Sequence, residues 1–428
     1  MLTPRDNELL TRVGPGTALG SLMRRYWLPA LPSADLEADG RPMRVRLLSQ
    51  DLVVFRDSRG SVGVLDEFCP HRQVSLFFAR NEASGLRCVY HGWKFDVHGR
   101  CVDLPSEPPD SPMRDRVAAQ AWPCAEHGGL VWTYLGEGAP PPLPDFEWAL
   151  VPPAQRYASR RLLECNWAQG LEGDIDSSHA SFLHAMLDPQ AYASYDRPAR
   201  ALYMDADGHP RYEVDRTPYG LVIGARRGIE GGERHYWRVA QYIVPFTTMP
   251  APYEDELYRC NIWVPRDDVS TMTFVVDWHP SRALTDRERE TRGTGLTAHC
   301  HEFEPGAQSR PRANRDNDYL FRNERQREDN YSGIREIWAQ DKAVVESMGP
   351  VMDRSREHLG SSDKPLVEFR KLLLAAVKSG GQPGQPSPAA SMLVRSASFT
   401  AGAADDWRAV ASEHTRAGVG IAPHPQTV

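Results

Sequence analysis

The sequence of 428 residues lacks the features that would place it in a membrane or on a nucleic acid. Its longest apolar run, Leu372 to Val377, has six residues, whereas a membrane-spanning helix needs about 20. It has 50 basic and 57 acidic residues, a net charge of −7, so no positive excess favours nucleic acid or anionic lipid. The first residues lack the charged and apolar regions of a signal peptide. We therefore expect a cytoplasmic protein.

Cysteine is scarce, and its distribution argues against a disulfide framework. The seven cysteines are an odd number spread widely along the chain, a pattern typical of metal ligands or buried thiols in a reducing compartment. The glycine-rich stretch 228–232 lacks the strand–turn–helix fingerprint of a dinucleotide-binding fold, and we interpret it as a surface turn. The sequence therefore predicts neither a flavin domain nor a nicotinamide domain.

Local patterns divide the chain into four segments. Thr3 before Pro4 is typical of a helix start. From Met43 to about residue 132, short alternating strands and Gly-bearing turns predict a compact all-β domain, and the Gly/Pro-rich stretch 136–144 is the clearest linker. We therefore expect a helical segment at 1–25 packed on the second domain, a β domain at 26–140, the second domain at 145–380 and a flexible Gly/Pro/Ser-rich tail at 381–428.

The second domain mixes strands with helices, which is typical of an α+β fold. Strands are predicted near 211–225, 236–246, 257–264 and 271–278, and helices near 333–348 and 364–378.

The β domain contains the sharpest motif, in which Cys69 and His71 are followed after sixteen residues by Cys88 and His91. A zinc finger pairs two cysteines on one side with two histidines on the other, whereas here each loop supplies one of each. That order suits a two-iron cluster of the Rieske type, with both thiolates on one iron and both imidazoles on the other. The alternatives are a tetrahedral zinc site or two unrelated Cys–His pairs.

A second cluster of possible ligands lies in residues 166–184. Asp176 and His179 are three apart and would share a helical face. His184 lies five residues beyond His179, about 140° round an ideal helix, so a shared metal requires the helix to end or bulge between them. Two histidines and one carboxylate form the facial triad of non-haem iron(II) oxygenases.

The third ligand is expected to be distant in sequence. Asp341 falls in an apolar stripe that runs from Ile334 to Met348, and a carboxylate on a buried face is costly unless it is paired or metal-bound. The alternative is that Asp341 pairs with an arginine such as Arg335 or Arg354, and that the two histidines are ordinary core residues.

Taken together, these motifs resemble the Rieske non-haem iron ring-hydroxylating oxygenases, specifically the large oxygenase component of the phthalate 4,5-dioxygenase type. The resemblance runs from about Leu9 to Leu374. The matching stretches are Gly14–Thr17, Arg25–Trp27, Tyr90–Asp96, Asp103–Pro108, residues 166–184, Gln340–Asp341 and Glu346–Pro350. It implies an α+β fold, with an N-terminal all-β Rieske domain and a catalytic domain that has an antiparallel sheet with flanking helices, of the helix-grip type.

The resemblance also implies two metal centres. The [2Fe–2S] cluster would be held by Cys69, His71, Cys88 and His91. The mononuclear Fe(II) would be held by His179, His184 and Asp341. Asp176 would link that iron, through hydrogen bonds, to the partner subunit's His91. The implied assembly is a homotrimer or a hexamer of stacked trimers. A separate NADH-dependent reductase, with flavin and a ferredoxin-type cluster, would supply electrons.

The expected function is hydroxylation of an aromatic substrate with O2, with a phthalate-like acid or a substituted benzoate as the expected substrate. The alternatives are a Rieske monooxygenase or O-demethylase, which would also cleave aryl ethers, and a Rieske electron-transfer protein. A carboxylate substrate would be bound by Arg200, Arg211 or Arg238, because a guanidinium binds a carboxylate through two hydrogen bonds, with Ser177 beside them. Each of these arginines is alternatively a surface charge at a strand edge.

Overall fold

The computed structural model describes residues 1–188, 202–252, 257–306, 309–380 and 393–417. The chain forms two compact units. The small unit is Val13–Leu143, and the large unit joins Met1–Arg12 to the residues from Pro144 onward. The border after Leu143 falls inside the Gly/Pro-rich stretch 136–144. Among the described residues, no helix is long and apolar enough to cross a membrane.

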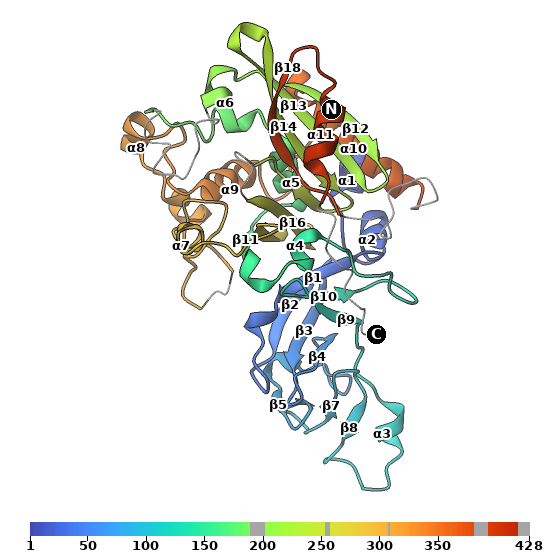
Figure 1. Cartoon of the computed structure of the whole chain (residues 1–428). Coiled ribbons are helices and arrows are strands. Elements are labelled where there is room, and N and C mark those ends of the chain that lie inside the picture. The colour runs from blue at the N-terminus through green and yellow to red at the C-terminus, as the bar shows by residue number, and fades with distance from the viewer. Residues whose placement is uncertain (189–201, 253–256, 307–308, 381–392, 418–428) are drawn as a thin grey trace. The chain divides into compact units, whose positions relative to one another are not determined.

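The small unit consists of three antiparallel sheets (Figure 1). Their strands, in spatial order, are β1 (Trp27–Pro32), β10 (Leu130–Tyr134) and β9 (Cys124–His127); β2 (Met43–Leu47), β3 (Gln50–Arg56) and β4 (Val62–Asp66); and β5 (Arg80–Glu82), β6 (Gly85–Arg87), β7 (Lys94–Phe95) and β8 (Cys101–Asp103). The helices α2 (Ala18–Met23) and α3 (Met113–Arg116) belong to the same unit.

The hairpin of β2 and β3 shows how the sequence pattern produces these strands. Met43 and Leu47 are buried, and the arginines between them are exposed, which confirms the predicted alternation. The connecting residues Leu48 and Ser49 have φ values of 49° and 63°. Two consecutive positive φ values are typical of a type I′ turn, whose twist matches that of the two strands it connects.

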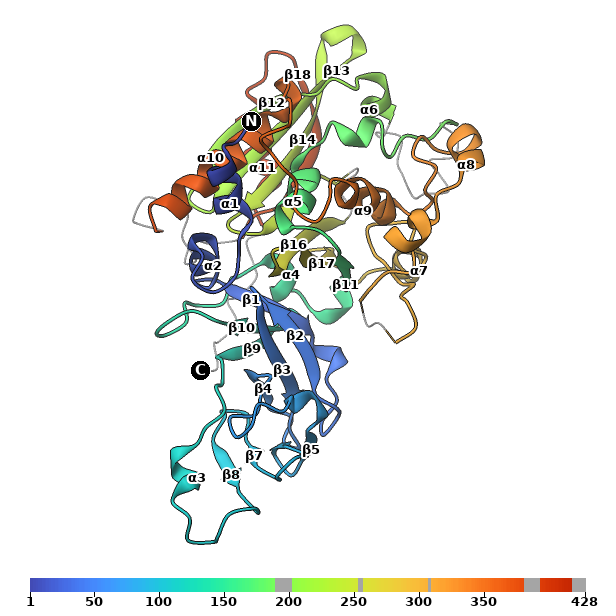
Figure 2. The same cartoon turned by 180° about the vertical axis from the view of Figure 1, so that it is seen from behind.

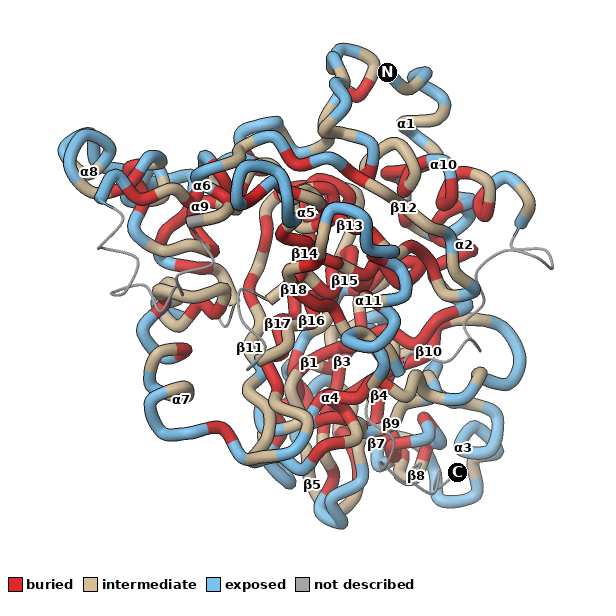
Figure 3. Tube along the Cα trace, turned by 45° about the horizontal axis from the view of Figure 1, so that its top comes forward, coloured by how far each residue is buried: buried red, intermediate tan, exposed pale blue. Residues whose placement is uncertain are grey.

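The large unit is built on one antiparallel eight-stranded sheet. Its strands, in spatial order, are β11 (Arg156–Leu163), β17 (Ser270–Trp278), β16 (Tyr258–Asp267), β15 (Thr247–Met249), β14 (Arg234–Ile243), β13 (Gly220–Ile229) and β12 (Arg211–Thr217), with β18 (Ala397–Gly402) paired to β14. The predicted stretch 211–225 is thus a hairpin of two strands. Figure 3 shows buried residues along these strands and exposed ones on α8 (Asn323–Glu328).

Helices pack against this sheet and complete the predicted α+β fold, which is confirmed. The two that position the site are α5 (Trp167–Ile175) and α9 (Ile337–Ser347), which pack against each other. A third, α10 (Lys364–Lys378), buries Phe369 and Leu373 and contacts β12. The remaining helices of this unit are α1 (Pro4–Thr11), α4 (Glu147–Leu150), α6 (Leu202–Ala206), α7 (Asp286–Gly293), α8 and α11 (Trp407–Thr415).

The N-terminal segment differs from the prediction in where it belongs. Thr3 caps α1 by accepting a hydrogen bond from the backbone N–H of Asp6, and α1 lies beside α10 (Figure 2). The second predicted helix, α2, belongs instead to the small unit, because the two units divide after Arg12. The segment 1–25 is therefore divided between the two units.

The expected flexible tail is also corrected for its described part, residues 393–417. Strand β18 pairs with β14 over six residues of each strand, and α11 follows it. Trp407 stacks on Trp237 with ring centroids 4.8 Å apart and donates its indole N–H to Glu213. The prediction was wrong because the abundance of small residues obscured the alternating apolar residues of the strand, such as Phe399. Residues 381–392 and 418–428 lie outside the described residues.

Candidate metal centres

The first candidate centre lies in two tight loops of the small unit. Cys69 follows β4 and Cys88 follows β6, and the two cysteines are only 1% and 4% exposed. The rings of His71 and His91 have centroids 4.5 Å apart, and His71 stacks on the buried Trp93 at 4.2 Å. The structure thus brings the four predicted cluster residues together as two buried thiols and two partly exposed imidazoles.

The chemistry of this donor set fits a [2Fe–2S] cluster. Burial raises the pKa of the Cys69 thiol to about 11, and the neighbouring Cys88 raises it as well. A buried thiol of this kind gives up its proton when a cation replaces it. Two adjacent thiols with two adjacent imidazoles can therefore hold two irons, with the thiolates on one iron and the imidazoles on the other.

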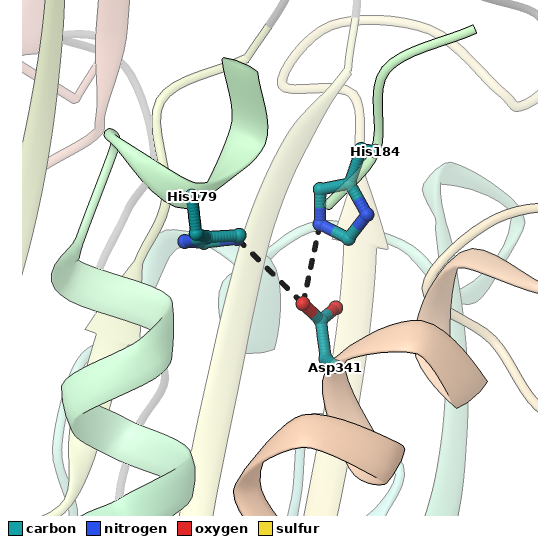
Figure 4. Close-up of side chains that lie close together, drawn as sticks. All are labelled: His179, His184 and Asp341. Atoms are coloured by element: carbon teal, nitrogen blue, oxygen red, sulfur yellow. Dashed lines mark ion pairs between the residues drawn. The ribbon is translucent and has the colours of Figure 1, made fainter. Parts of the chain in front are cut away.

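The second candidate centre joins a loop to a helix of the large unit. Helix α5 ends at Ile175, so His179 and His184 both lie beyond it, His179 at the start of a short 3-10 helix (His179–Ser181) and His184 in the loop after that helix. Nε2 of His184 is 3.2 Å and Nε2 of His179 is 3.6 Å from Oδ1 of Asp341 on α9 (Figure 4). One ligand atom from each residue lies within 4.8 Å of the others.

The structure changes two predictions that rested on helical spacing, those for Asp176 and Asp341. Asp176 is the cap residue that directly follows α5 and has an extended backbone, so its proximity to His179 does not come from a shared helical face. Asp341 is not enclosed by apolar side chains, because 39% of its side chain is exposed and it lines a cavity. The alternative, a pairing of Asp341 with Arg335 or Arg354, does not occur, since Arg354 binds Glu172 instead and Asp341 faces the histidines.

The electrostatics of this site favour a bound cation. Burial disfavours charge on His179, but Asp176 and Asp341 outweigh that effect and raise the pKa of the imidazole. Burial likewise disfavours charge on Asp341, but His184 and His179 lower the pKa of the carboxyl. The carboxylates that stabilise a protonated imidazole also stabilise a metal ion, so the donor set fits a facial triad.

Gln340 fixes the orientation of His184. Nδ1 of His184 lies 2.6 Å from Oε1 of Gln340, whose amide in turn donates to the carbonyl of Ile334. Because an amide oxygen only accepts, Nδ1 carries the proton, and Nε2 is left free of it on the side of Asp341.

Asp176 is held by Tyr212, which the sequence analysis did not single out. The Tyr212 hydroxyl donates to Oδ1 of Asp176 at 3.1 Å and accepts from the backbone N–H of Ser177 at 2.8 Å. Oδ2 of Asp176 lies 3.6 Å from Nδ1 of His179. Tyr212 therefore fixes the carboxylate that contacts an iron-ligand candidate.

Arg227 holds the same loop from the other side. It is fully buried and donates to the Ser177 carbonyl at 2.8 Å and to the Ser181 hydroxyl at 3.2 Å. The sequence contained a signal for it, because Arg227 occupies an inward position of a strand whose other inward residues, such as Ile223 and Ala225, are apolar.

The predicted substrate contacts divide three ways. Arg238 and Ser177 line the cavity of about 1160 Å³ that also holds the triad, and Arg238 donates to the carbonyls of Ala251 and Pro252. Arg211 is exposed on β12 and is not among the described residues that line this cavity, so the structure gives no support to that contact. Arg200 lies outside the described residues.

The fold and the two ligand sets define the class of protein as a non-haem iron oxygenase of the Rieske type. The family model of the Rieske [2Fe–2S] domain matches residues 26–123, and that of the LigXa C-terminal-domain-like family matches residues 133–423. The chain belongs to the Rieske non-haem iron oxygenases with a C-terminal domain of this family, which confirms the predicted resemblance and its two iron cofactors.

Several relatives align over most of the chain. The phthalate 4,5-dioxygenase oxygenase subunit of Pseudomonas putida is 39% identical, over 88% of this chain and 86% of the relative. The 3-chlorobenzoate-3,4-dioxygenase oxygenase subunit of Comamonas testosteroni is 38% identical, over 89% of each. The 5,5'-dehydrodivanillate O-demethylase oxygenase subunit of a Sphingobium species is 41% identical, over 87% of this chain and 80% of the relative.

A solved structure shows the same fold. The terminal oxygenase of carbazole 1,9a-dioxygenase from Nocardioides aromaticivorans has a TM-score of 0.58 at 18% identity, covering 88% of this chain and 97% of that one.

Proposed function

We propose that this chain is the oxygenase component that hydroxylates an aromatic carboxylate, such as a phthalate or a substituted benzoate, with O2 and external electrons. This proposal rests on one observation: along most of its length, the chain is similar to two oxygenase subunits named for phthalate and 3-chlorobenzoate. The cavity supports it, because apolar side chains such as Ile223 and Trp263 line it together with several arginines. A ring with a charged substituent matches that lining.

The metal ligands follow from the two donor sets. Cys69, His71, Cys88 and His91 hold the [2Fe–2S] cluster, and His179, His184 and Asp341 hold the mononuclear iron. The cluster supplies electrons one at a time, and the mononuclear iron supplies the site of O2 activation. Gln340 keeps His184 in the correct tautomer, and Arg227 with Tyr212 keeps the loop in place.

The chain works with partners. A separate NADH-dependent reductase, with flavin and a ferredoxin-type cluster, reduces the Rieske cluster. Val89 and Tyr90, next to His91, are 56% and 53% exposed, which favours a protein contact there. The assembly is a homotrimer or a hexamer of stacked trimers, in which Asp176 of one chain contacts the partner subunit's His91.

Oxygenation of a methyl ether is the second candidate function. It is favoured by the 41% identity to the 5,5'-dehydrodivanillate O-demethylase subunit. The same residues would hold the same metals, and the outcome would depend on whether a ring carbon or a methoxy group lies nearest the iron. A pure electron carrier is excluded, because the chain is an oxygenase with a complete second domain.

Substrate-dependent O2 uptake distinguishes these functions. The iron-loaded protein would be combined with a Rieske-system reductase and NADH, and offered phthalate, 3-chlorobenzoate or a methoxybenzoate under isotopically labelled O2. We expect a dihydroxylated acid that contains both atoms of one O2. A phenol formed with release of formaldehyde would instead support the second function. Uptake that no carboxylate stimulates would contradict the proposed substrate class.

A further inference from the structure

The cavity beside the iron-ligand candidates contains an arginine that the sequence analysis did not single out. Arg161 lies on β11 two residues before Leu163, so both side chains point to the same face of the sheet, and both line the cavity. Only 5% of Arg161 is exposed. Its guanidinium is therefore enclosed by protein and open only toward this cavity.

Arg161 has few contacts for a buried cation. Nη1 of Arg161 donates to the carbonyl oxygen of Ala298 at 2.6 Å, and within the described part of the chain its side chain forms no other hydrogen bond and no ion pair. A guanidinium has five N–H donors, so most of them remain for a ligand. Burying a charge without a paired counter-charge is costly, and a fold that retains such a group has an anionic ligand as its natural complement.

Two further arginines of the same cavity share a single carboxylate, which leaves none for Arg161. Arg259 and Arg292 both donate to Asp277, each at 2.7 Å, so one carboxylate serves two guanidiniums. His299 lies 3.3 Å from Asp277, but burial lowers the pKa of its imidazole to about 4, and it is neutral at pH 7. Asp277 and all three arginines line the same cavity, as do Asp174 and Asp341, so the three positive charges are balanced overall while Arg161 itself has no carboxylate in contact with it.

The other carboxylates near Arg161 have partners of their own. Asp174 accepts hydrogen bonds from Thr248 and from the Asn261 amide, and Asp341 faces the two histidines. Both attract Arg161 through space, but neither is in contact with it. The fork of the guanidinium is therefore available to an oxyanion that enters the cavity.

We propose that Arg161 binds the carboxylate of the substrate through two parallel N–H···O hydrogen bonds. This inference deepens the proposed function and rests on it. The planar guanidinium matches a carboxylate in geometry as well as charge, and Leu163 and Trp263 on the same cavity wall suit an aromatic ring. By fixing the carboxylate, Arg161 also determines which ring carbon faces the mononuclear centre.

Binding measurements on two variants test this role without relying on turnover. Isothermal titration calorimetry of the iron-loaded protein would compare phthalate with its neutral dimethyl ester. For Arg161→Gln we expect phthalate to bind about 10- to 100-fold more weakly, the loss of a charged bidentate contact, while the ester changes little. Arg161→Lys should lie in between, because it keeps the charge but loses the fork. Arg211→Gln, on the exposed strand β12, is the matched control and should bind phthalate like the wild type.

Each result decides between named alternatives. If Arg161→Gln binds phthalate as tightly as the wild type, the anchor is elsewhere and the inference is wrong while the proposed function stands. If phthalate and ester weaken equally and iron content falls, Arg161 serves only to balance Asp341 and Asp174, which also overturns the inference. If wild type binds the ester but no carboxylate, the substrate class fails and the inference with it. If Arg161→Gln does not fold, Arg161→Lys decides. A weaker affinity for phthalate with little change for the ester supports the inference, and an equal change for both overturns it.

Discussion

At the residue scale, the proposed mononuclear centre depends on side chains that contact the proposed metal ligands and not the metal itself. His184 presents Nε2 to Asp341 because Nδ1–H of its imidazole donates a hydrogen bond to Oε1 of Gln340. An apolar replacement of similar size leaves the loop intact but lets the imidazole rotate or change tautomer. The iron affinity of the site is therefore set in part by an amide that never contacts iron.

Replacing Gln340 with Leu should lower iron affinity or activity about 10- to 100-fold, with the visible absorption of the Rieske cluster unchanged. Iron content per chain, measured after dialysis against a weak chelator, checks this. Asp341→Ala is the matched control, because it removes a ligand outright and should lose the mononuclear iron completely. Full iron retention in Gln340→Leu would contradict the role of the amide.

Tyr212 should matter for electron delivery and much less for metal content. Tyr212→Phe removes the hydroxyl that holds Asp176, so the carboxylate loses its fixed position while both ligand sets stay intact. We expect the cluster to be reduced at the normal rate but reoxidised by substrate and O2 several-fold more slowly. Asp176→Asn should behave in the same way and more severely. Stopped-flow absorption of the cluster measures both steps, and normal reoxidation in Tyr212→Phe would rule out this role.

The ligands and their supporting residues differ in how far the sequence predicts them. The spacing of the two Cys–His pairs restricts the chemistry, so the cluster ligands could be proposed without coordinates. Asp341 was proposed from its place in an apolar stripe and, like the pair His179 and His184, from the family resemblance. Tyr212 gave no such signal, because its role depends on a loop that it meets only in the folded chain. Arg227 did give one, since it occupies an inward position of a strand whose neighbouring inward residues are apolar. Arg161 gave a weaker one, since it shares its face of the strand with Leu163 on one side and with Ser159 on the other.

At the scale of elements, β18 and α11 form part of the core of the large unit. Their residues Phe399 and Trp407 are 4% exposed and pack with Trp237 and Val239 of β14. Helices α9 and α10 and strands β12, β13, β14, β16 and β17 of this unit were predictable from periodicity. This pair was not, because a segment rich in small residues can pair in a sheet when its partner strand supplies the bulk, and the partner lies some 160 residues earlier.

Trp407→Ala should destabilise the large unit by about 3–5 kcal/mol, the usual cost of emptying a buried aromatic site. It removes the stacking on Trp237 and leaves Glu213 without its indole donor. Thermal unfolding followed by tryptophan fluorescence checks this. The exposed Arg408, beside it on α11, provides the control, since Arg408→Ala should cost less than about 1 kcal/mol. Equal midpoints for Trp407→Ala and wild type would mean that α11 is not part of the cooperative core.

At the scale of the whole molecule, buried ion pairs set the response to acid. Burial disfavours charge on Glu172, but Arg354 and Arg370 outweigh this effect and lower the pKa of the carboxyl. Burial disfavours charge on Asp277 as well, but Arg259, His299 and Arg292 hold the pKa of its carboxyl well below the ordinary value. Groups with a depressed folded-state pKa stabilise the fold above their unfolded pKa, and this stability is lost as the pH falls.

Thermal midpoints should therefore be nearly constant from pH 8 to about pH 6.5 and fall steeply below about pH 5. His299 acts in the same direction, because its pKa of about 4 lies below that of an unfolded histidine. Scanning calorimetry across this range measures the effect. Glu172→Gln should be less stable at pH 7 by about 3–5 kcal/mol, because two buried arginines lose their partner, and should show a shallower decline in acid. A decline as steep as that of the wild type would contradict the assignment to Glu172.

The proposed assembly makes a prediction about pairs of inactive chains. His91→Ala loses the cluster and Asp176→Asn breaks the link on the acceptor side. A mixed trimer contains an interface where an intact cluster faces an intact Asp176, so activity should return after the two variants are dissociated and assembled together. Substrate-dependent O2 uptake by the mixture, against each variant alone, is the measurement. No recovery in verified mixed trimers would favour electron transfer within one chain.

The small unit is inserted in the sequence of the large one, and this has a consequence for synthesis on the ribosome. Every strand of the small unit has been translated by residue 143, so its core can close while the rest of the chain is still being made. In the large unit, α1 is translated more than 350 residues before its partner helix α10. Strand β14 is likewise translated well before its partner strand β18. Nascent chains stalled between these points should therefore resist protease in the small unit and be cleaved in the large one.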